Sequence, residues 1–578
     1  MVLRVMAKCV LFTILSSLFF LSASYGEPEV TILQGNLLGT TMTTRKNRSI
    51  SAFLGIPYGQ PPIGNLRFAN PVEAIAWNGT RNATRDGSTC PQALGGISGS
   101  EDCLYLNVYT PQLPMNTSTL LPVMVFIHGG AFIYGSSSSA TFSPDYLLDS
   151  DIVLALPNYR LGALGFLSTG NEVAAGNWGL KDQILALKWV QNNIEFFGGD
   201  PNQVTLFGQS AGSASVHLLS LSKATEGLFH RYITQSGSAL SSWAHLPSAS
   251  YASRAFQLGG FVGCDNETSS ALIECLRTVN ASDIVASASK FYVWESVPVV
   301  VWGPTDEPDI EGAVLTDSPK NLFAQHEFRD LPWIAGIVRD EGILMTGEFY
   351  NDEEKFRDFC DNFDLVLPEM LTWIYQTDLG AAWVKAVKTY YFNDDFTTNS
   401  TELLTNMTRL VGDAIFIYPT LDALQQQLPL AEKNQYFYMF NYRGTYSLDA
   451  GVPDAVVHTD DVIYLFPMRS FFGGGNLSDT DYEMVDNMVQ LWTSFAINGT
   501  PTTLASEGSV TWTEYSTMDN YLLIGNQSEV TLSMEYSLFE ERMEFWASLV
   551  HGSETSAATL ANTSTGILVL LFICSKLM

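Results

Sequence analysis

The sequence predicts an α/β fold with a large, mostly parallel central sheet, helices on both faces and helical cap insertions. Apolar, β-branched runs alternate with helical stretches along the whole chain, which is typical of a sheet covered by helices. Several of these runs end in glycine-rich or polar turns, where open α/β sheets place their functional residues. With 578 residues and 46% hydrophobic content, the chain can bury a large core.

Short apolar runs predict the individual strands. They lie at Pro122–His128, Ile152–Pro157, Val204–Phe207, Ile233–Gln235, Trp333–Val338 and Tyr436–Tyr442. A helix over Ser210–Leu221 should follow the third strand directly. Helical spacing of apolar residues predicts a second helix, Tyr482–Ile497, with one face in the core. The insertions Cys264–Ile310 and Asn351–Leu404 are expected to form helical caps beside the site.

The N-terminal residues 1–26 have the order of a secretory signal peptide. Arg4 and Lys8 precede the apolar run Cys9–Leu21, and small residues follow up to Gly26. No linker rich in Pro, Gly or Ser interrupts residues 27–550, so these are expected to form a single catalytic domain.

Residues 551–578 form a C-terminal tail. Small polar residues at Ser553–Gly566 precede an apolar run at Ile567–Cys574, which is the pattern of a GPI-anchor signal. Because the apolar run is shorter than usual for such signals, a frayed tail is the other interpretation. The tail predicts contact with a membrane only through such a lipid anchor.

Other features also indicate an extracellular protein. The cysteine pairs Cys90/Cys103 and Cys264/Cys275 are close in sequence and predict two short disulfide loops. Cys360 is left as a free buried thiol. No close Cys-x-x-Cys or histidine pair accompanies them, so no metal site is expected. Candidate N-glycosylation sites are Asn47, Asn78, Asn82, Asn116, Asn266, Asn280, Asn399, Asn406, Asn476, Asn498, Asn526 and Asn562.

The formal net charge of -31 argues against one class of partner. A surface this acidic repels nucleic-acid phosphates and anionic membranes, so no nucleic-acid partner is expected. A small-molecule substrate is the expected partner.

The motif Gly208-Gln209-Ser210-Ala211-Gly212 carries the strongest chemical signal. It follows a predicted strand and opens a predicted helix, which is the context in which a G-x-S-x-G serine is exposed as a nucleophile. Upstream, His128-Gly129-Gly130-Ala131 also follows a strand and resembles a loop that supplies backbone N–H groups to an oxyanion hole. The donor candidates are Gly130, Ala131 and Ala211.

The order Ser, then acid, then His constrains the partners of Ser210. Among the histidines that follow it, His458 lies in a long loop after a strand and is the predicted general base. Asp340 and Glu341 both follow the strand Trp333–Val338 directly. The sequence pattern does not choose between these two acids.

Several blocks resemble the type-B carboxylesterase and cholinesterase family, including insect carboxylesterases and juvenile hormone esterases. They are Phe53–Phe68, Glu101–Val108, Asn158–Gly162, Gly199–Gly212, Gln235–Ser238 and Gly412–Ala414. The resemblance runs from about residue 30 to residue 547 and implies an α/β-hydrolase fold with a Ser210, Glu341, His458 triad.

The resemblance also implies the roles of other residues. It assigns the oxyanion hole to Gly130, Ala131 and Ala211, and it pairs Cys90 with Cys103 and Cys264 with Cys275. It makes Arg67–Glu101 and Arg160–Asp182 structural ion pairs. Trp243 is expected in the acyl pocket.

Departures from the family pattern narrow the expected substrate. Pro91–Asp102 contains no aromatic residue, whereas cholinesterases stack choline on a tryptophan there. Gln209 stands before the serine, where the family usually has glutamate. Both changes favour neutral, apolar esters. Ala455 replaces a glycine of the juvenile hormone esterase motif, so a general insect-type carboxylesterase is preferred over a hormone esterase.

The predicted activity is therefore a serine carboxylic ester hydrolase that forms an acyl-enzyme and uses no cofactor. A juvenile hormone esterase is the narrower alternative. An adhesion protein or an ester-sequestering protein of the same fold, with little catalytic turnover, is the alternative from another class.

Overall fold

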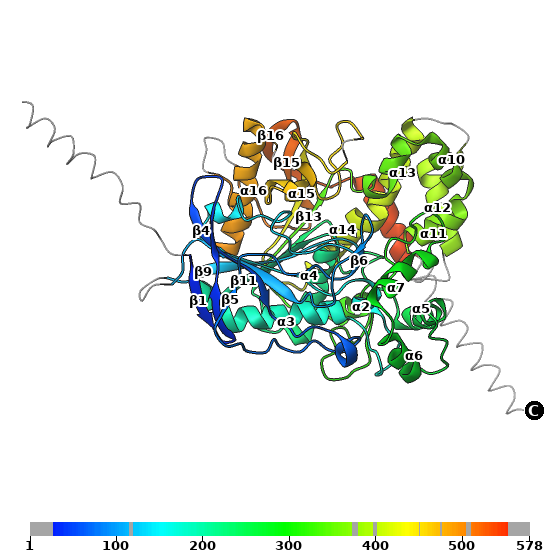
Figure 1. The fold of residues 1–578 in the computed structure, drawn as a ribbon. Coiled ribbons are helices and arrows are strands. Elements are labelled where there is room, and N and C mark those ends of the chain that lie inside the picture. The colour runs from blue at the N-terminus through cyan, green and yellow to red at the C-terminus, as the bar shows by residue number, and fades with distance from the viewer. Residues whose placement is uncertain are drawn as a thin grey trace, which may run out of the picture.

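A mixed sheet of eleven strands forms the centre of the molecule in the computed structural model (Figure 1). The structure describes residues 27–114, 119–372, 380–396, 401–449, 451–473, 475, 477–504 and 510–552. The strands of the sheet are β3 (Thr40–Thr43), β4 (Ser49–Pro57), β8 (Tyr105–Thr110), β9 (Leu121–Ile127), β10 (Val153–Pro157), β11 (Gly199–Gln209), β12 (Arg231–Gln235), β13 (Trp333–Val338), β14 (Gln435–Tyr442), β15 (Asn520–Gln527) and β16 (Glu529–Tyr536).

The strands follow the order β16-β15-β14-β13-β12-β11-β9-β10-β8-β4-β3. Neighbours from β15 to β10 in this order are parallel. The pairs at both ends of the sheet are antiparallel. The chain leaves β9 towards β10 on one side and later returns as β11 on the other side. Ligand sites of α/β sheets lie beside such a reversal.

The predicted fold class is confirmed by this sheet. Each predicted strand lies in it, and β13 has the predicted bounds. The antiparallel strands at the two ends were not predicted. Smaller sheets, also not predicted, join β1 (Glu29–Ile32), β2 (Gly35–Leu38) and β5 (Thr80–Asn82), and β6 (Gln92–Ala93) with β7 (Ile97–Ser98).

Two hydrophobic layers cover the two faces of the sheet. Along β9, Val123, Val125 and Ile127 belong to one buried cluster, and Met124 and Phe126 to the other. This alternation follows from the two-residue period of a strand. Helices α3 (Trp178–Asn193) and α4 (Ala211–Leu221) pack into the first layer, and α16 (Asp479–Asn498) packs into the second (Figure 1).

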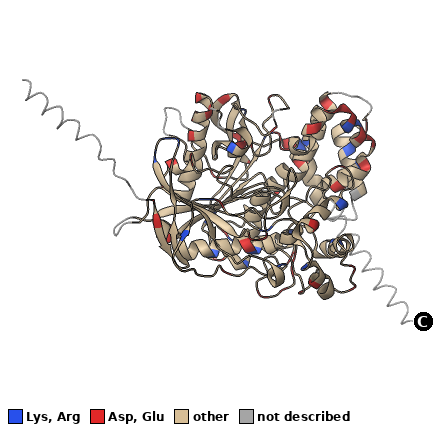
Figure 2. Cartoon of the chain, viewed as in Figure 1, with Lys and Arg blue, Asp and Glu red and all other residues tan. Residues whose placement is uncertain are grey.

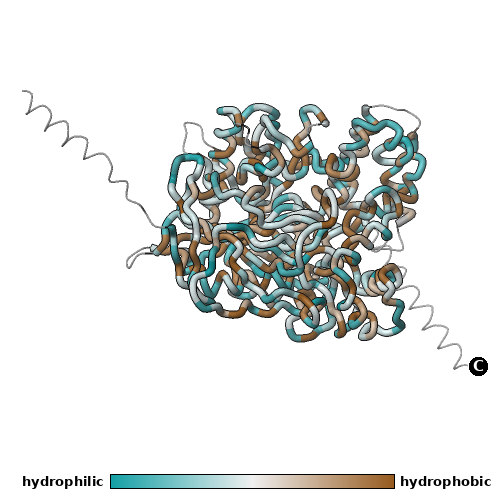
Figure 3. The backbone as a smooth tube through the Cα atoms, viewed as in Figure 1, coloured by the Kyte–Doolittle hydropathy of each residue, from teal (hydrophilic) through white to brown (hydrophobic). Residues whose placement is uncertain are grey.

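Helices beyond the sheet edge form the expected cap, at the right of Figure 1. Their outer turns are largely hydrophilic (Figure 3). The first insertion carries α6 (Ser269–Leu276) and α7 (Ala281–Ala286), after α5 (Ser248–Phe261). The second carries α10 (Glu353–Asp361), α11 (Phe363–Met370), α12 (Gly380–Phe392) and α13 (Thr401–Gly412), followed by a π-helix at Asp413–Ile417 and α14 (Tyr418–Gln427). Short helices α2 (Gly162–Phe166), α8 (Pro319–Ala324), α9 (Ile343–Thr346) and α15 (Arg469–Phe472) complete the described elements.

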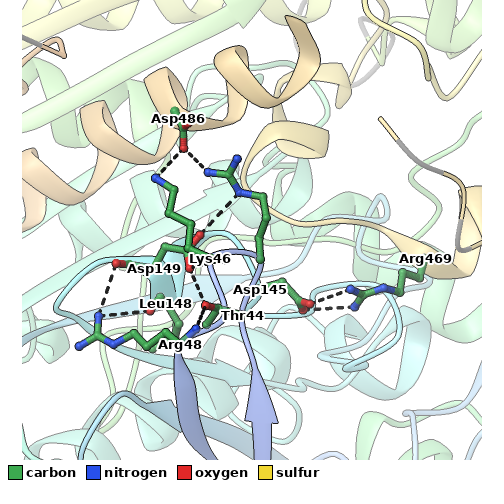
Figure 4. A network of polar contacts seen from close by, with 9 residues as sticks. Thr44, Lys46, Arg48, Asp145, Leu148, Asp149, Arg469 and Asp486 are labelled. Carbon is green, nitrogen blue, oxygen red and sulfur yellow. Dashed lines mark hydrogen bonds and ion pairs between the residues drawn. The ribbon is translucent and has the colours of Figure 1, made fainter. Parts of the chain in front are cut away.

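A polar network ties the turn between β3 and β4 to the rest of the fold (Figure 4). Asp486 on α16 contacts both Arg45 and Lys46 of this turn. Nearby, the carboxylate of Asp145 lies 2.7 Å from the guanidinium of Arg469 at the start of α15. These contacts anchor an edge of the sheet that has few other covering elements.

The predicted disulfides are confirmed. Cys90 is bonded to Cys103, and Cys264 to Cys275. Cys360 is a free thiol, but it is partly exposed rather than buried as predicted, because it lies on α10 near the surface. The predicted signal peptide and the tail from residue 553 onward lie outside the described residues. Among the residues that are described, none forms a helix long and apolar enough to span a bilayer.

Candidate active site

Ser210 lies on a sharp bend between the end of β11 and the start of α4. Its φ of 57° is unusual for a residue with a side chain and indicates local strain. The bend requires glycine on both sides. A Cβ atom on Gly208 would lie 2.5 Å from the carbonyl oxygen of Gly212, and one on Gly212 would lie 2.0 Å from that of Ile127. The bend leaves Ser210 partly exposed at the carboxyl end of the parallel strands.

The loop after β9 passes directly over this bend, because β9 and β11 are neighbours in the sheet. A Cβ atom on Gly129 would lie 3.0 Å from the Cβ of Ser210. Gly130 and Ala131 have positive φ angles of 109° and 52°. In the described part of the chain, no hydrogen-bond acceptor is paired with the N–H groups of Gly130, Ala131 and Ala211. These three groups are therefore free to donate to a bound oxygen.

The ring of His128 supports this loop from below. It stacks on Tyr159 at a centroid distance of 4.4 Å, and its Nδ1 lies 2.8 Å from the carbonyl oxygen of Gly129. Burial lowers the pKa of His128 to about 4, so the ring is neutral at physiological pH. A neutral, stacked ring fixes the loop and adds no charge beside the serine.

Glu341 and His458 form a buried hydrogen-bonded pair. Oε2 of Glu341 lies 2.6 Å from Nδ1 of His458, and Oε1 accepts the backbone N–H of Val338 at 2.9 Å. The Glu341 side chain is fully buried, and that of His458 is 4% exposed.

The neighbouring acid, Asp340, points elsewhere. Its Oδ2 accepts from the guanidinium of Arg339 and from the backbone N–H of Val456. The alternative that the sequence pattern left open is therefore decided by geometry, because Glu341 is the acid that contacts the imidazole.

The second ring nitrogen of His458 contacts Gln209 rather than the serine. Nε2 of His458 lies 3.0 Å from the amide nitrogen of Gln209, which also donates to Oγ1 of Thr459 at 2.7 Å. No hydrogen bond joins Ser210 to His458 among the described residues. The expected serine–histidine contact is thus one residue away from being formed, since Gln209 directly precedes Ser210.

The other histidines after Ser210 in the described part of the chain have structural surroundings. His217 is buried on α4, where its Nδ1 accepts the backbone N–H of Ala239 at 3.2 Å. Burial lowers the pKa of His217 to about 3. Near the C-terminus, Nε2 of His551 lies 3.1 Å from Asp422. Neither ring contacts Ser210, Gln209 or Glu341.

Known proteins share this sequence over most of its length. Residues 26–546 match the profile of the carboxylesterase family. The chain belongs to the carboxylesterase family. It is 35% identical to the juvenile hormone esterase of Tribolium castaneum over 556 residues, covering 90% of this chain and 93% of that protein. It is 38% identical to esterase E4 of Myzus persicae, covering 85% and 89%, and 33% identical to the cocaine esterase of Homo sapiens, covering 90% and 91%. The protein is a carboxylic ester hydrolase.

In this carboxylesterase, an aromatic wall lies beside Ser210. A Cβ atom on Gly237 would contact both the carbonyl oxygen of Ser210 and the indole of Trp243. The Trp243 ring lies 6.2 Å from that of Phe132 and 5.7 Å from that of Phe416, and its Nε1 donates to the carbonyl of Ile415 at 2.9 Å. Phe416 also packs against His458, with ring centroids 4.5 Å apart.

Phe132, Phe416 and Thr459 were not identified from the sequence. Phe416 lies in the π-helix directly after the family block Gly412–Ala414, and π-helical turns are frequent at functional sites. That block was the available signal, but nothing in the local sequence places the ring against His458. Thr459 has a φ of 83°, which cannot be read from residue types.

The ion pairs expected of the carboxylesterase family are present. Arg67 contacts Glu101 through two hydrogen bonds of 2.6 Å, and Arg160 contacts Asp182 at 2.8 and 2.7 Å. Burial raises the pKa of Asp182, and the Arg160 guanidinium opposes this rise. Both pairs brace loops near the site and do not contact the serine.

The sequons differ in accessibility. Those with an exposed asparagine are Asn47, Asn78, Asn82, Asn280, Asn498 and Asn526, whereas Asn266 and Asn406 are partly buried. The amide nitrogen of Asn406, which a glycan would occupy, donates to the carbonyl of Tyr391 at 3.1 Å. Asn116, Asn399, Asn476 and Asn562 lie outside the described residues.

Proposed function

We propose that the enzyme hydrolyses neutral, largely apolar esters through an acyl-enzyme formed on Ser210. The observation that carries the proposal is the arrangement of one strained serine, three unpaired backbone donors and a buried Glu341–His458 pair around a single bend. A free serine hydroxyl is a poor nucleophile and needs such a base.

In the proposed mechanism, Ser210 Oγ attacks the ester carbonyl while Nε2 of His458 takes its proton. Glu341 keeps the proton on Nδ1 and stabilises the imidazolium. The N–H groups of Gly130, Ala131 and Ala211 stabilise the oxyanion, each contributing about 3 kcal/mol. His458 then protonates the leaving alcohol, and water repeats the sequence to release the acid.

The surroundings of Ser210 support a neutral, apolar substrate. Phe132, Trp243 and Phe416 present aromatic surface near the serine. The residue before the serine is the neutral Gln209, and the disulfide loop between Cys90 and Cys103 carries no aromatic ring to stack on a cation. A choline ester would therefore lose its main attractive contacts.

A juvenile hormone ester is the narrower candidate. It is favoured by the likeness to the Tribolium castaneum juvenile hormone esterase and by Gln209. Against it, Ala455 replaces the motif glycine and is buried among Ile343, Val452 and Val457. We therefore prefer the wider class of apolar esters.

We also propose that the enzyme acts outside the cell. The support is the signal-like N-terminus, the sequons with exposed asparagines and the two disulfides, which persist in oxidising compartments. A lipid anchor replacing the tail is compatible with this location. Mass spectrometry of the protein secreted from insect cells would reveal a chain starting near residue 27. Retention of residues 1–26 would contradict secretion.

The test of the catalytic proposal is a substrate panel with Ser210→Ala as the control. Wild type should hydrolyse short-chain aryl and aliphatic esters, with little turnover of a choline ester of equal acyl length. Ser210→Ala should lose activity on all of them. Wild-type turnover by Ser210→Ala would refute the mechanism. A burst of product with almost no steady state would instead favour an ester-sequestering protein.

A further inference from the structure

The contact between Gln209 and His458 occupies the atom that the proposed mechanism needs. Nδ1 of His458 faces a carboxylate oxygen of Glu341 at 2.6 Å, so Nδ1 carries the ring proton. In the neutral ring, Nε2 then has one lone pair and no hydrogen. The amide nitrogen of Gln209 lies 3.0 Å from that lone pair and can donate to it.

The orientation of the Gln209 amide follows from this assignment. If the amide were reversed, its oxygen would face the lone pair of Nε2, and two acceptors would meet. With the NH2 group towards the ring, one hydrogen reaches Nε2, and the same nitrogen lies 2.7 Å from Oγ1 of Thr459. The Gln209 side chain is buried, so water does not compete for these positions.

One lone pair cannot accept fully from two donors. Either the amide of Gln209 or the hydroxyl of Ser210 occupies Nε2, and only the second arrangement activates the serine. We propose that Gln209 is a positioning residue that holds His458 in a resting arrangement, with its base nitrogen on the amide, and that ester entry transfers this nitrogen to Ser210. This inference rests on the serine mechanism proposed above.

The geometry makes this transfer small. Gln209 and Ser210 are consecutive, so Nε2 has to move by about one residue spacing while Nδ1 keeps its contact with Glu341. Phe416 packs against the ring as it pivots. When the ring leaves, the amide of Gln209 retains Thr459 Oγ1 as an acceptor. Thr459 adjoins His458 in the chain, so the resting arrangement is held by one short segment.

A glutamate at position 209 would act differently. A carboxylate cannot donate to the lone pair of Nε2, but it attracts the protonated ring. The amide therefore favours a neutral, restrained base, whereas the carboxylate common in the family would favour the imidazolium. The other charged groups near the ring, Glu341 and Asp461, are unchanged by a substitution at position 209.

The test compares wild type, Gln209→Met and Gln183→Met by the rate of reaction with a small fluorophosphonate. Gln209→Met keeps the length of the side chain but removes the donor. Its rate constant should rise about 3-fold to 10-fold, because one neutral hydrogen bond no longer holds the base. Gln183 is a buried glutamine bonded to Ser215, so Gln183→Met is the matched control and should react like wild type.

An unchanged or slower reaction of Gln209→Met would overturn the proposal, because a merely structural glutamine cannot restrain the base. If Gln209→Met does not fold, Gln209→Glu decides. The added carboxylate should raise the pKa of His458, so the acid limb of the rate profile should move to higher pH by about one unit. An unmoved limb would overturn the proposal. Failure of wild type to be labelled would refute the serine mechanism itself, which is a separate outcome.

Discussion

At the scale of single residues, the site depends on backbone positions that only glycine can occupy. Gly130 has a φ of 109°, and a Cβ atom on it would lie 2.0 Å from the carbonyl oxygen of Tyr134. The loop that carries the proposed oxyanion donors is therefore fixed by close contacts within itself. Gly260 on α5 provides a contrast, because a Cβ atom there meets nothing within 4 Å.

Gly130→Ala should reduce kcat for a short-chain aryl ester by about 100-fold or more, because the displaced loop no longer directs its N–H groups at the oxyanion. Gly260→Ala is the control and should keep wild-type kcat. Steady-state kinetics of the two variants checks the prediction. Equal activity of Gly130→Ala and wild type would show that this loop does not stabilise the transition state.

The two adjacent acids give a second test at this scale. Glu341→Gln should reduce kcat by about 10⁴-fold, because the amide can stabilise the wrong tautomer of His458. Asp340→Asn should keep kcat within a few-fold, since Asp340 contacts Arg339 and the backbone of Val456 instead of the ring. Stopped-flow or steady-state assays distinguish them. A larger loss in Asp340→Asn would reverse the assignment of the acid.

At the scale of elements, the buried parallel strands could be predicted from the sequence, and the edges could not. Fully buried strands such as β13 are continuous apolar runs and are easily recognised. The edge strand β16 has almost no buried residues, so its sequence carries no such signal. The bend at Ser210 was recognisable because Gly208 and Gly212 mark it. The contact of Gln209 with His458 was not, because it joins residues 249 positions apart.

The ion pairs between elements should differ in strength according to burial. Asp182 and Arg160 are 0% and 3% exposed, so Asp182→Asn leaves a buried, unpaired guanidinium. Its free energy of unfolding should fall by about 3–5 kcal/mol. Asp486, in the surface network of Figure 4, is 33% exposed, and Asp486→Asn should cost about 1 kcal/mol or less.

Urea unfolding of both variants at low and high salt checks this difference. The cost of Asp486→Asn should shrink in high salt because solvent ions screen exposed charges, whereas that of Asp182→Asn should persist. Equal costs for the two variants would contradict the structural role assigned to the Arg160–Asp182 pair.

At the scale of the whole molecule, the excess of acidic over basic residues lies around an apolar interior. The net charge is -31, and Figure 2 shows acidic side chains spread over the helices that surround the sheet. The charge and the two hydrophobic layers could be predicted from composition and alternation. The cap arrangement could not, because helix packing beyond the sheet depends on contacts between distant segments.

Buried histidines should make the stability of the whole chain depend on pH. The pKa of His217 is lowered by burial from 6.5 to about 3, so the unfolded chain binds the proton that the folded chain excludes. Stability is therefore lost as the pH falls through this window, by about 1.4 kcal/mol per pH unit for the one proton. His217→Gln should remove this part of the slope, as measured by urea unfolding across the window. An unchanged slope would contradict the burial of a neutral ring.

The most direct test of the central claim is peptide mapping of the protein after reaction with a fluorophosphonate. One adduct per chain is expected, on the peptide that contains Ser210, and it should be absent in Ser210→Ala. His458→Ala should be labelled far more slowly than wild type, because the base no longer takes the serine proton. An adduct on another residue, or equal labelling of Ser210→Ala, would contradict the assignment of Ser210 as the nucleophile.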